Sequence, residues 1–475
     1  MGSYGLLEST LKEILEAIKP LGEDRLTRDR VIADLRQVVQ SLEDFRGATV
    51  EPFGSFVSNL FTRWGDLDIS IELPNGSHIS SSSKRRKRSL LDLLFRVLRQ
   101  RGGWNRLQFI SRATVPILKF VSSPHGISCD VSIDNLEGQM KSKFLLWINE
   151  IDGRFREMVL LVKEWAKAYD INDPKNGTLN SYSLSLLVIF HFQTCLPAIL
   201  PPLRYLYPGN LVDDLTGVRA VAERRIAEVC ATNIARFKSD RSRLLNRSSL
   251  SELFVSFIAK YRDINSKAHQ LGIFPFTGQW ESLSSNTRWL LRNKALFIED
   301  PFEQASNTAR TVSLNNLTKI SEAFVTTHRK LVSGNQTRNS LLATLARPHI
   351  FPFNTNGPVN YSRYNGGPNQ TTLPQAHRAG NSPQTQHHYR AGTSPQMQHR
   401  YRAGSSGSSQ MQHHYRAGNS PQTQTQHQYL PVSSSSQIQA QYGYPRRSTP
   451  QGQHQFQNRR QSPSFQSQVQ FQNRR

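Results

Sequence analysis

Two aspartates separated by one residue, Asp66 and Asp68, stand in the segment GDLDISI (65–71). Successive side chains of a strand point to opposite faces, so a strand here would place both aspartates on one face and Leu67 and Ile69 on the other. Carboxylates about 6–7 Å apart along a strand repel each other, but their oxygens are ligands that hard divalent cations prefer. The pattern predicts a metal site; two exposed acids on a strand face are the alternative.

A third acid is expected from the segment ISCDVSI (127–133), which repeats the same alternation. Asp130 falls on its polar face, whereas Cys129 and Val131 fall on the apolar face and are expected in the core. Asp134 shares the parity of Asp130 but follows the last apolar residue, so it ranks second. The predicted catalytic and metal-binding residues are Asp66, Asp68 and Asp130.

Gly54 and Ser55 precede Asp66 by twelve and eleven residues and come just before an expected short helical stretch. Free backbone N–H groups at a helix start bind phosphate, and a serine hydroxyl adds a donor. Two metal ions about 3.5–4 Å apart stabilise the attacking and leaving oxygens of an in-line displacement at phosphorus. The combination of this Gly-Ser pair with the acids predicts phosphoryl transfer.

A helical segment, FREMVLLVKEWAKA (155–168), carries Lys163 and Lys167 four residues apart and therefore on one face. Two cations so placed would hold a triphosphate; a solvated lysine face is the alternative. His191 lies in an apolar helical pattern and is expected to be a core residue rather than a ligand. The basic run Lys84–Arg88 is expected in a loop, as a nuclear import signal, an RNA backbone contact or a solvated segment.

The composition restricts the class of protein. Among 475 residues, 59 Lys and Arg against 35 Asp and Glu give a net charge of +24, which favours nucleic acid or an anionic membrane surface as partner. Three cysteines are too few for a disulfide framework or a Cys-based zinc site and indicate a reducing compartment. The N-terminal segment is not typical of a signal peptide, and the strongest apolar run (184–192) is too short to span a bilayer.

A sharp change of composition falls near Pro348. Residues 351–475 contain no Asp, Glu, Lys, Trp or Cys, but carry twelve Arg and eight His among Gln, Ser, Asn, Gly and Pro. Repeats such as RAGNSPQTQHHY (from 378) and RAGTSPQMQHRY (from 390) are too polar to bury an apolar face. We expect a disordered tail that binds RNA weakly or associates with itself; a solvated tail without a task is the alternative.

The preceding 350 residues show a mixed α/β pattern. We expect helices at 6–18, 28–47 and 89–101, strands at 69–73, 115–121 and 127–133, and almost entirely helical structure from 140 to 265. This pattern predicts an α+β protein in which a small mixed-sheet domain is inserted in a helical domain, with a cleft between them. The expected divisions are N-terminal helices that pack with the helical domain (1–44), the sheet domain (45–138), the helical domain (139–347) and the tail (348–475).

Four segments carry a family resemblance: GSFVSNLFTRWGDLDIS, FREMVLLVKEWAKA, NGTLNSYSLSLLVIFHFQ and IEDPFEQASNTAR. With them the chain resembles the DNA polymerase β-like nucleotidyltransferase superfamily over roughly residues 5–330. Within it, the chain looks like the terminal nucleotidyltransferases that extend RNA 3′ ends, and most like the plant uridylyltransferases of small RNAs that lack a 3′-terminal 2′-O-methyl group. The resemblance implies transfer of uridine from UTP to an RNA 3′-OH, which marks the RNA for decay.

The resemblance also implies a role for each site residue. Asp66 and Asp68 would bind two Mg²⁺ or Mn²⁺ ions, and Asp130 would help to hold the ion that activates the 3′-OH. Lys163 and Lys167 would hold the triphosphate. Ser181 would touch the base or the triphosphate, Tyr182 would stack on the base, and Asp300 and Glu303 would lie near its edge. A core aromatic residue at 182 and a structural turn at 300–303 are the alternatives.

Two positions depart from the family pattern. Some uridine-specific relatives have a His where this chain has Ser306, and relatives have an Asn against the ribose where this chain has Lys141. Two alternative functions therefore remain: an RNA adenylyltransferase of the same fold and a catalytically inert RNA-binding scaffold. The expected partners are RNA 3′ ends, UTP and small-RNA effector proteins, with no membrane. We expect a monomer, with weak tail-driven association, in the cytoplasm, in granules and in the nucleus.

Overall fold

The computed structural model describes residues 3–74, 78–79, 82–285, 295–304 and 306–351. The chain divides into two units, residues 1–368 and 369–475, and everything described below lies in the first unit. The tail that the sequence predicts to be disordered lies outside the described residues, apart from its first positions up to Phe351.

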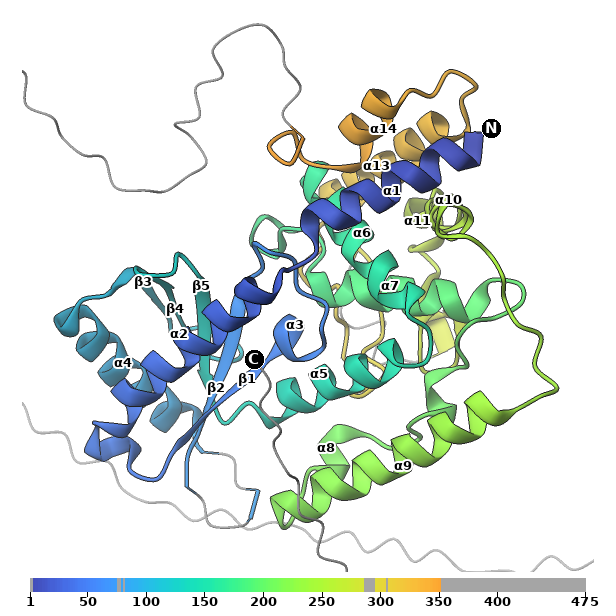
Figure 1. Ribbon diagram of the computed structural model, residues 1–475. Helices are drawn as coiled ribbons and strands as arrows, with labels where there is room; N and C mark the ends of the chain where they lie inside the picture. The colour runs from blue at the N-terminus through green and yellow to red at the C-terminus, as the bar shows by residue number, and fades with distance from the viewer. Residues whose placement is uncertain (1–2, 75–77, 80–81, 286–294, 305, 352–475) are drawn as a thin grey trace, which may run out of the picture. The chain divides into compact units, whose positions relative to one another are not determined.

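A five-stranded mixed sheet has the strand order β1-β2-β5-β4-β3 (Figure 1). The strands are β1 (Thr49–Phe53), β2 (Leu67–Glu72), β3 (Trp104–Ile110), β4 (Ile117–Ser122) and β5 (Ser128–Ile133). Strands β2 and β5 run parallel, and the other pairs are antiparallel. The strands predicted at 69–73, 115–121 and 127–133 are confirmed as β2, β4 and β5, whereas β1 and β3 were not predicted.

Two helices, α2 (Gly22–Gln40) and α4 (Lys84–Arg101), share one hydrophobic core with the sheet. Leu91, Leu94 and Leu98 of α4 are fully buried against it, at the spacing of one helix face. This finding corrects the loop predicted at 84–88, because the basic run forms the first turns of α4. The Ser83 side chain accepts a hydrogen bond from the Arg86 backbone N–H and caps the helix there.

Most of the remaining helices pack around a second hydrophobic core. They are α1 (Ser3–Ile18), α5 (Leu136–Asn149), α6 (Arg154–Ala168), α7 (Ser181–Thr194), α9 (Arg219–Ser239), α10 (Leu250–Lys260), α13 (Leu314–Val332) and α14 (Arg338–Leu345). Shorter elements are α3 (Gly54–Val57), α8 (Leu211–Asp214), α11 (Ile264–Lys267), the hairpin of β6 (Leu271–Phe274) and β7 (Gln279–Ser282), and 3₁₀ turns at Glu43–Phe45, Pro174–Asn176, Leu203–Tyr205 and Leu283–Ser285. The predicted sheet domain beside a helical part is therefore present.

The two N-terminal helices pack against different cores. Helix α1 packs against α6, α10 and α14 of the helical part. Helix α2 packs instead against β1, because Val31, Leu35 and Val39 face the core of the sheet. The predicted helix 28–47 is also shifted, since α2 ends at Gln40 and a 3₁₀ turn follows.

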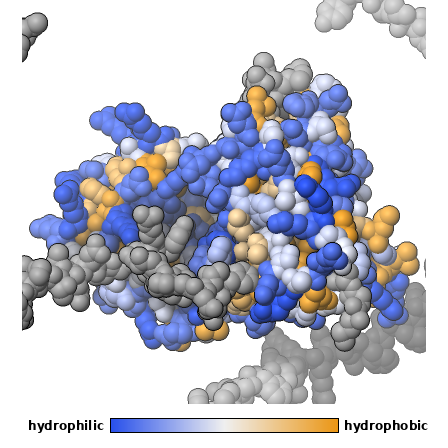
Figure 2. All heavy atoms as spheres, turned by 90° about the horizontal axis from the view of Figure 1, so that it is seen from above, coloured by the Kyte–Doolittle hydropathy of each residue, from blue (hydrophilic) through white to orange (hydrophobic). Residues whose placement is uncertain are grey.

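The surface of the described residues is largely hydrophilic. On the face in Figure 2, hydrophobic side chains form separate small patches between polar ones. No described helix has the length and apolar character needed to cross a membrane. His191 is 1% exposed and lies among core residues, and Cys129 is fully buried, so both predictions of core positions are confirmed.

Candidate active site

Gly54 brings the start of α3 against the sheet. Its φ of +68° lies in the left-handed region, and a Cβ atom built there would stand 2.0 Å from Oδ2 of Asp68. A side chain at position 54 would therefore displace the carboxylate, so glycine is required by both conformation and space. The Gly54 backbone N–H donates to Oγ of Ser142 at 2.6 Å, which joins this turn to α5.

Asp68 and Asp130 are register partners on the parallel strands β2 and β5. Leu67, Ile69 and Cys129 are fully buried on the other face of the sheet, so the predicted alternation is present. Asp66 precedes the first residue of β2 by one position. All three aspartates line one cavity of about 720 Å³, together with Gly54 and Ser55.

The carboxylates in this cavity destabilise one another's charge. Burial, together with the nearby charges of Asp130 and Asp66, raises the pKa of Asp68 to about 7. Burial also raises the pKa of Asp130, against the opposing effect of Lys119. Nζ of Lys119 donates to Oδ1 of Asp130 at 2.6 Å from the neighbouring strand β4. Lys119 was not predicted as a site residue, although it occupies the polar face of the alternating segment ILKFVS.

The donor set fits hard divalent cations. Asp66, Asp68 and Asp130 offer only carboxylate oxygens, and a cation between them would remove the repulsion that favours the neutral form of Asp68. Within the described ranges, no His, Cys, Asp and Glu side chains already converge in groups of three or more at metal-binding geometry. The ammonium group of Lys119 pairs with Asp130 in this arrangement.

Lys163 and Lys167 line the same cavity from α6. Burial, together with the adjacent positive charge of Lys167, lowers the pKa of Lys163 to about 8. Nζ of Lys163 donates to the backbone oxygen of Leu60 at 2.8 Å. Burial likewise lowers the pKa of Lys167, and Arg347 adds to the effect. Lys163 is buried and Lys167 is half-buried, and neither forms an ion pair with a carboxylate among the described residues. Two such cations are suited to an anion with several charges, such as a triphosphate.

Ser181 and Tyr182 line the cavity at the start of α7, where the side chain of Asn180 caps the helix by accepting from the backbone N–H of Ser183. Oγ of Ser181 lies 3.3 Å from the side-chain nitrogen of Asn172. The hydroxyl of Tyr182 donates to Oδ1 of Asp300 at 3.1 Å.

Asp300 and Glu303 belong to a turn that does not itself line the cavity. The turn joins the cavity through Lys141, whose Nζ lies 2.8 Å from Oδ2 of Asp300 and 2.5 Å from Oε2 of Glu303. The backbone of Ser306 stabilises this turn. Its N–H donates to the backbone oxygen of Glu303, and its backbone oxygen accepts from the N–H of Asp300. The contact between Lys141 and the two acids was not predicted, because it joins residues about 160 positions apart.

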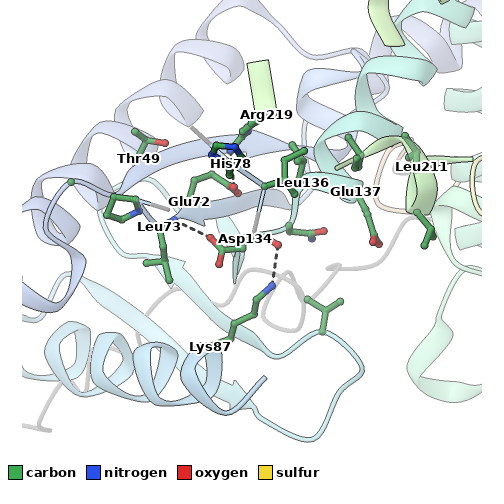
Figure 3. A pocket seen from close by; sticks show the side chains of 17 residues that line it. Thr49, Glu72, Leu73, His78, Lys87, Asp134, Leu136, Glu137, Leu211 and Arg219 are labelled. Atoms are coloured by element: carbon green, nitrogen blue, oxygen red, sulfur yellow. Dashed lines mark hydrogen bonds and ion pairs between the residues drawn. The ribbon is translucent and has the colours of Figure 1, made fainter. Parts of the chain in front are cut away.

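A second cavity, of about 550 Å³, lies at the opposite ends of β2 and β5 (Figure 3). Arg219 forms an ion pair with Glu72 there at 2.8 Å. Oδ1 of Asp134 accepts from the backbone of Leu73, and Lys87 donates to the backbone oxygen of Asp134 (Figure 3). Asp134, ranked second as the third acid, is therefore not part of the cavity that holds the other aspartates.

A parallel strand pair with an aspartate on each strand, beside two lysines of a helix in one cavity, is the arrangement of a nucleotidyltransferase. Residues 7–150 match the central palm domain of mitochondrial-like poly(A) RNA polymerases. Over 350 residues the chain is 62% identical to protein HESO1 of Arabidopsis thaliana, and the match covers 74% of this chain and 68% of that protein. The chain therefore belongs to the family of RNA nucleotidyltransferases that includes HESO1.

More distant relatives have the same fold. Poly(A) RNA polymerase cid11 of Schizosaccharomyces pombe is 27% identical, over 76% of this chain and 71% of the relative. Poly(A) RNA polymerase GLD2-A of Xenopus laevis is 29% identical, and the chain spans little more than half of its length, 56%. A solved cytoplasmic RNA terminal U-transferase superimposes with a TM-score of 0.56 at 24% identity, over 72% of this chain and 99% of that one.

Proposed function

We propose that this enzyme adds uridine from UTP to the 3′-OH ends of RNA without a template. The observation that carries the proposal is that three aspartates and two lysines line one cavity. The choice of UTP is supported by the 62% identity to HESO1 and by the fold shared with an RNA terminal U-transferase and with Cid1 poly(U) polymerase.

The residues of the cavity have different roles in the proposed reaction. Lys163 and Lys167 bind the triphosphate. The Ser55 hydroxyl and the N–H groups at the start of α3, other than that of Gly54, which donates to Ser142, offer further donors to phosphate. Tyr182 provides an aromatic face for the base. The RNA 3′-OH attacks the α-phosphate in line, and pyrophosphate leaves. Positioning and neutralisation of charge supply most of the rate.

Asp66, Asp68 and Asp130 would hold two divalent cations, Mg²⁺ or Mn²⁺. When bound, these ions supply Lewis-acid stabilisation of the charge that develops on the phosphate and lower the pKa of the attacking hydroxyl. A solved structure of Cid1 with bound MgGTP supports this choice of metal. Lys119 donates to both oxygens of Asp130, and each oxygen keeps a second lone pair that a cation could use.

The proposed RNA substrates are small RNAs and RNA fragments that lack a 3′-terminal 2′-O-methyl group and that uridylation marks for decay. The likeness to HESO1 supports this choice, and the net charge of +24 fits a polyanionic partner. We further propose small-RNA effector proteins as partners and a monomeric enzyme that acts in the cytoplasm, in granules and in the nucleus.

Primer extension tests the proposed function directly. The full chain is incubated with an unmodified single-stranded RNA, each nucleoside triphosphate separately, and Mn²⁺ or Mg²⁺. Extension with UTP well above that with ATP supports the proposal. Preferential extension with ATP would assign the chain to adenylyl transfer, which the Ser306 position and the relatives named poly(A) RNA polymerases favour. If no nucleotide is added, the result would favour the alternative that the chain is a catalytically inert RNA-binding scaffold.

A further inference from the structure

The second cavity, of about 550 Å³, has the size and the lining of a ligand site (Figure 3). Its walls include four buried leucines from the end of β2, the start of α5 and the region of α8, namely Leu73, Leu136, Leu211 and Leu215. The charge of Glu72 in this cavity is already paired with Arg219. Among the described residues, Nζ of Lys87 donates only to the backbone oxygen of Asp134, so further N–H donors of its ammonium group remain. The cavity is therefore suited to a ligand that combines an apolar ring with an anionic group.

A third cavity, of about 370 Å³, joins the second cavity to the active site. It shares Phe53, Asp68 and Asp130 with the active-site cavity. It shares Val115 and Asn135 with the second cavity. The three cavities therefore form one continuous groove, which follows β5 from Asp130 to the residues just beyond the end of the strand.

The lining of the third cavity indicates which reactant uses this groove. Lys163, Lys167 and Tyr182 line the active-site cavity and not the third cavity, whereas two of the aspartates line both. In an in-line displacement the attacking oxygen stands opposite the leaving group, so the RNA 3′-OH approaches the aspartates from the side away from the triphosphate. The groove therefore takes the RNA strand that carries the 3′-OH, and the preceding nucleotides lead toward the second cavity.

The basic run Lys84–Arg88 lies at the far end of this groove. Lys87 lines the second cavity, and Lys84 is exposed three residues before it, on the same face of α4. Nε of Arg88 donates to the backbone oxygen of Ser111 at 2.8 Å, which fixes the start of α4 to the segment that precedes β4. Lysine side chains contact phosphates and so position a nucleic-acid strand. The two lysines are therefore placed to bind the phosphates beside a base that enters the second cavity.

We propose that the second cavity and the start of α4 form an upstream subsite for the RNA: the cavity takes a base that precedes the 3′ end, and Lys84 and Lys87 bind the phosphates beside it. Asp130 and Asp134 are separated by ~13 Å along the strand direction, and a stacked strand advances ~3.4 Å per nucleotide, so the subsite lies about four stacked nucleotides from the 3′-OH. The inference rests on the proposed transfer to RNA 3′ ends and states where the acceptor strand binds.

The test compares Val212→Glu with Val332→Glu in UMP addition to an RNA dinucleotide and to an RNA octanucleotide. Val212 lines the second cavity and is 57% exposed, whereas Val332 at the end of α13 is 59% exposed and does not line the groove. A carboxylate at position 212 repels phosphate at the subsite. We expect KM for the octanucleotide to rise at least ~5-fold, as for the loss of one base contact, and KM for the dinucleotide and for UTP to stay unchanged. Val332→Glu should leave all three values unchanged.

Lys84→Ala tests the phosphate contacts at an exposed position, and it decides the question if Val212→Glu does not fold in thermal unfolding measurements. KM for the octanucleotide is measured at several salt concentrations. The loss of one phosphate contact should reduce the slope of log KM against log salt concentration by ~0.7. Lys330→Ala removes an exposed lysine of α13 and should keep the slope of the wild type.

Three results would overturn the inference: an equal rise of KM for both RNAs in folded Val212→Glu, a KM for the octanucleotide equal to that of the wild type or of Val332→Glu, or an unchanged salt slope in Lys84→Ala. The second result would leave the cavity to a ligand other than RNA. A wild-type chain that extends neither RNA with any nucleotide would overturn the proposed function itself, before any variant is compared.

Discussion

At the scale of single residues, the candidate site depends on close approaches that the sequence shows only in part. The alternation of apolar and polar residues correctly places Asp66, Asp68 and Asp130 on one face, because strand geometry fixes where each side chain points. The partners Lys119 and Lys141 depend on which strand or turn packs opposite them. Local periodicity holds no information about such neighbours, so these contacts were not predicted.

Gly54 offers a test at this scale. Replacing it with alanine forces a positive φ on a residue with a Cβ atom and pushes that atom onto Asp68. We expect Gly54→Ala to lose at least ~100-fold in activity, since a displacement of about 1 Å is sufficient for that. The free energy of unfolding should fall by about 1–2 kcal/mol.

Gly334→Ala is the matched control for Gly54→Ala. A Cβ atom at position 334 meets nothing within 4 Å, so this variant should keep full activity and stability. Chain extension and chemical denaturation measure the two quantities. Normal activity of Gly54→Ala would show that Asp68 does not need the position it has in this structure.

At the scale of elements, the sequence predicts the existence of elements better than their limits. The basic run 84–88 was predicted as a loop, and cations at a helix N-terminus do oppose the helix dipole. Burial of Leu91, Leu94 and Leu98 and the cap at Ser83 outweigh that penalty, so α4 begins at Lys84. Strand β1, with Pro52 in a segment of five residues, is too short and irregular to show a clear alternation.

The packing of α7 on α10 predicts a dependence of stability on pH. Burial, with a smaller effect of Lys260, lowers the pKa of His191 to about 3, and Nε2 of this residue lies 3.2 Å from Oγ of Ser256. The unfolded chain binds a proton at this residue below about pH 6.5, whereas the folded chain does not. The contribution of neutral His191 to the free energy of unfolding is therefore fully present above pH 6.5 and decreases progressively as the pH falls toward 3.

His191→Gln isolates this contribution, because glutamine is neutral and keeps a hydrogen-bonding group. Between pH 7 and pH 5, the free energy of unfolding of the wild type should fall by up to about 2 kcal/mol more than that of the variant. Urea denaturation at a series of pH values measures the difference. Parallel curves for the two proteins would mean that His191 is not held neutral in the folded state.

At the scale of the whole molecule, charge governs the encounter with RNA. Residues 351–475 carry twelve Arg and no acidic residue, which gives them a net charge of +12. A chain truncated after Phe351, which packs against the helical core, should still add single nucleotides. We expect it to bind RNA more weakly and with a smaller dependence on salt, because fewer counterions are released.

Binding isotherms at several salt concentrations, with the full-length chain as reference, measure this effect. The same affinity and salt slope for both proteins would mean that the tail has no part in RNA binding.

Specificity for the RNA end is a further prediction at this scale. A 2′-O-methyl group on the terminal ribose should block extension by the full chain, since the methyl group crowds the acceptor ribose at the site of attack. Extension of paired RNAs that differ only in this group measures the effect. Equal extension of both RNAs would contradict the proposal that small RNAs without the methyl group are the substrate class.

The central claim is that Asp66, Asp68 and Asp130 together carry out metal-dependent transfer of uridine. The most direct measurement is the single-turnover rate of UMP addition to RNA in Mn²⁺ by the wild type and by Asp66→Ala, with circular dichroism to verify the fold. We expect rapid addition by the wild type and a loss of at least ~100-fold in the folded variant. Full activity of Asp66→Ala would contradict it.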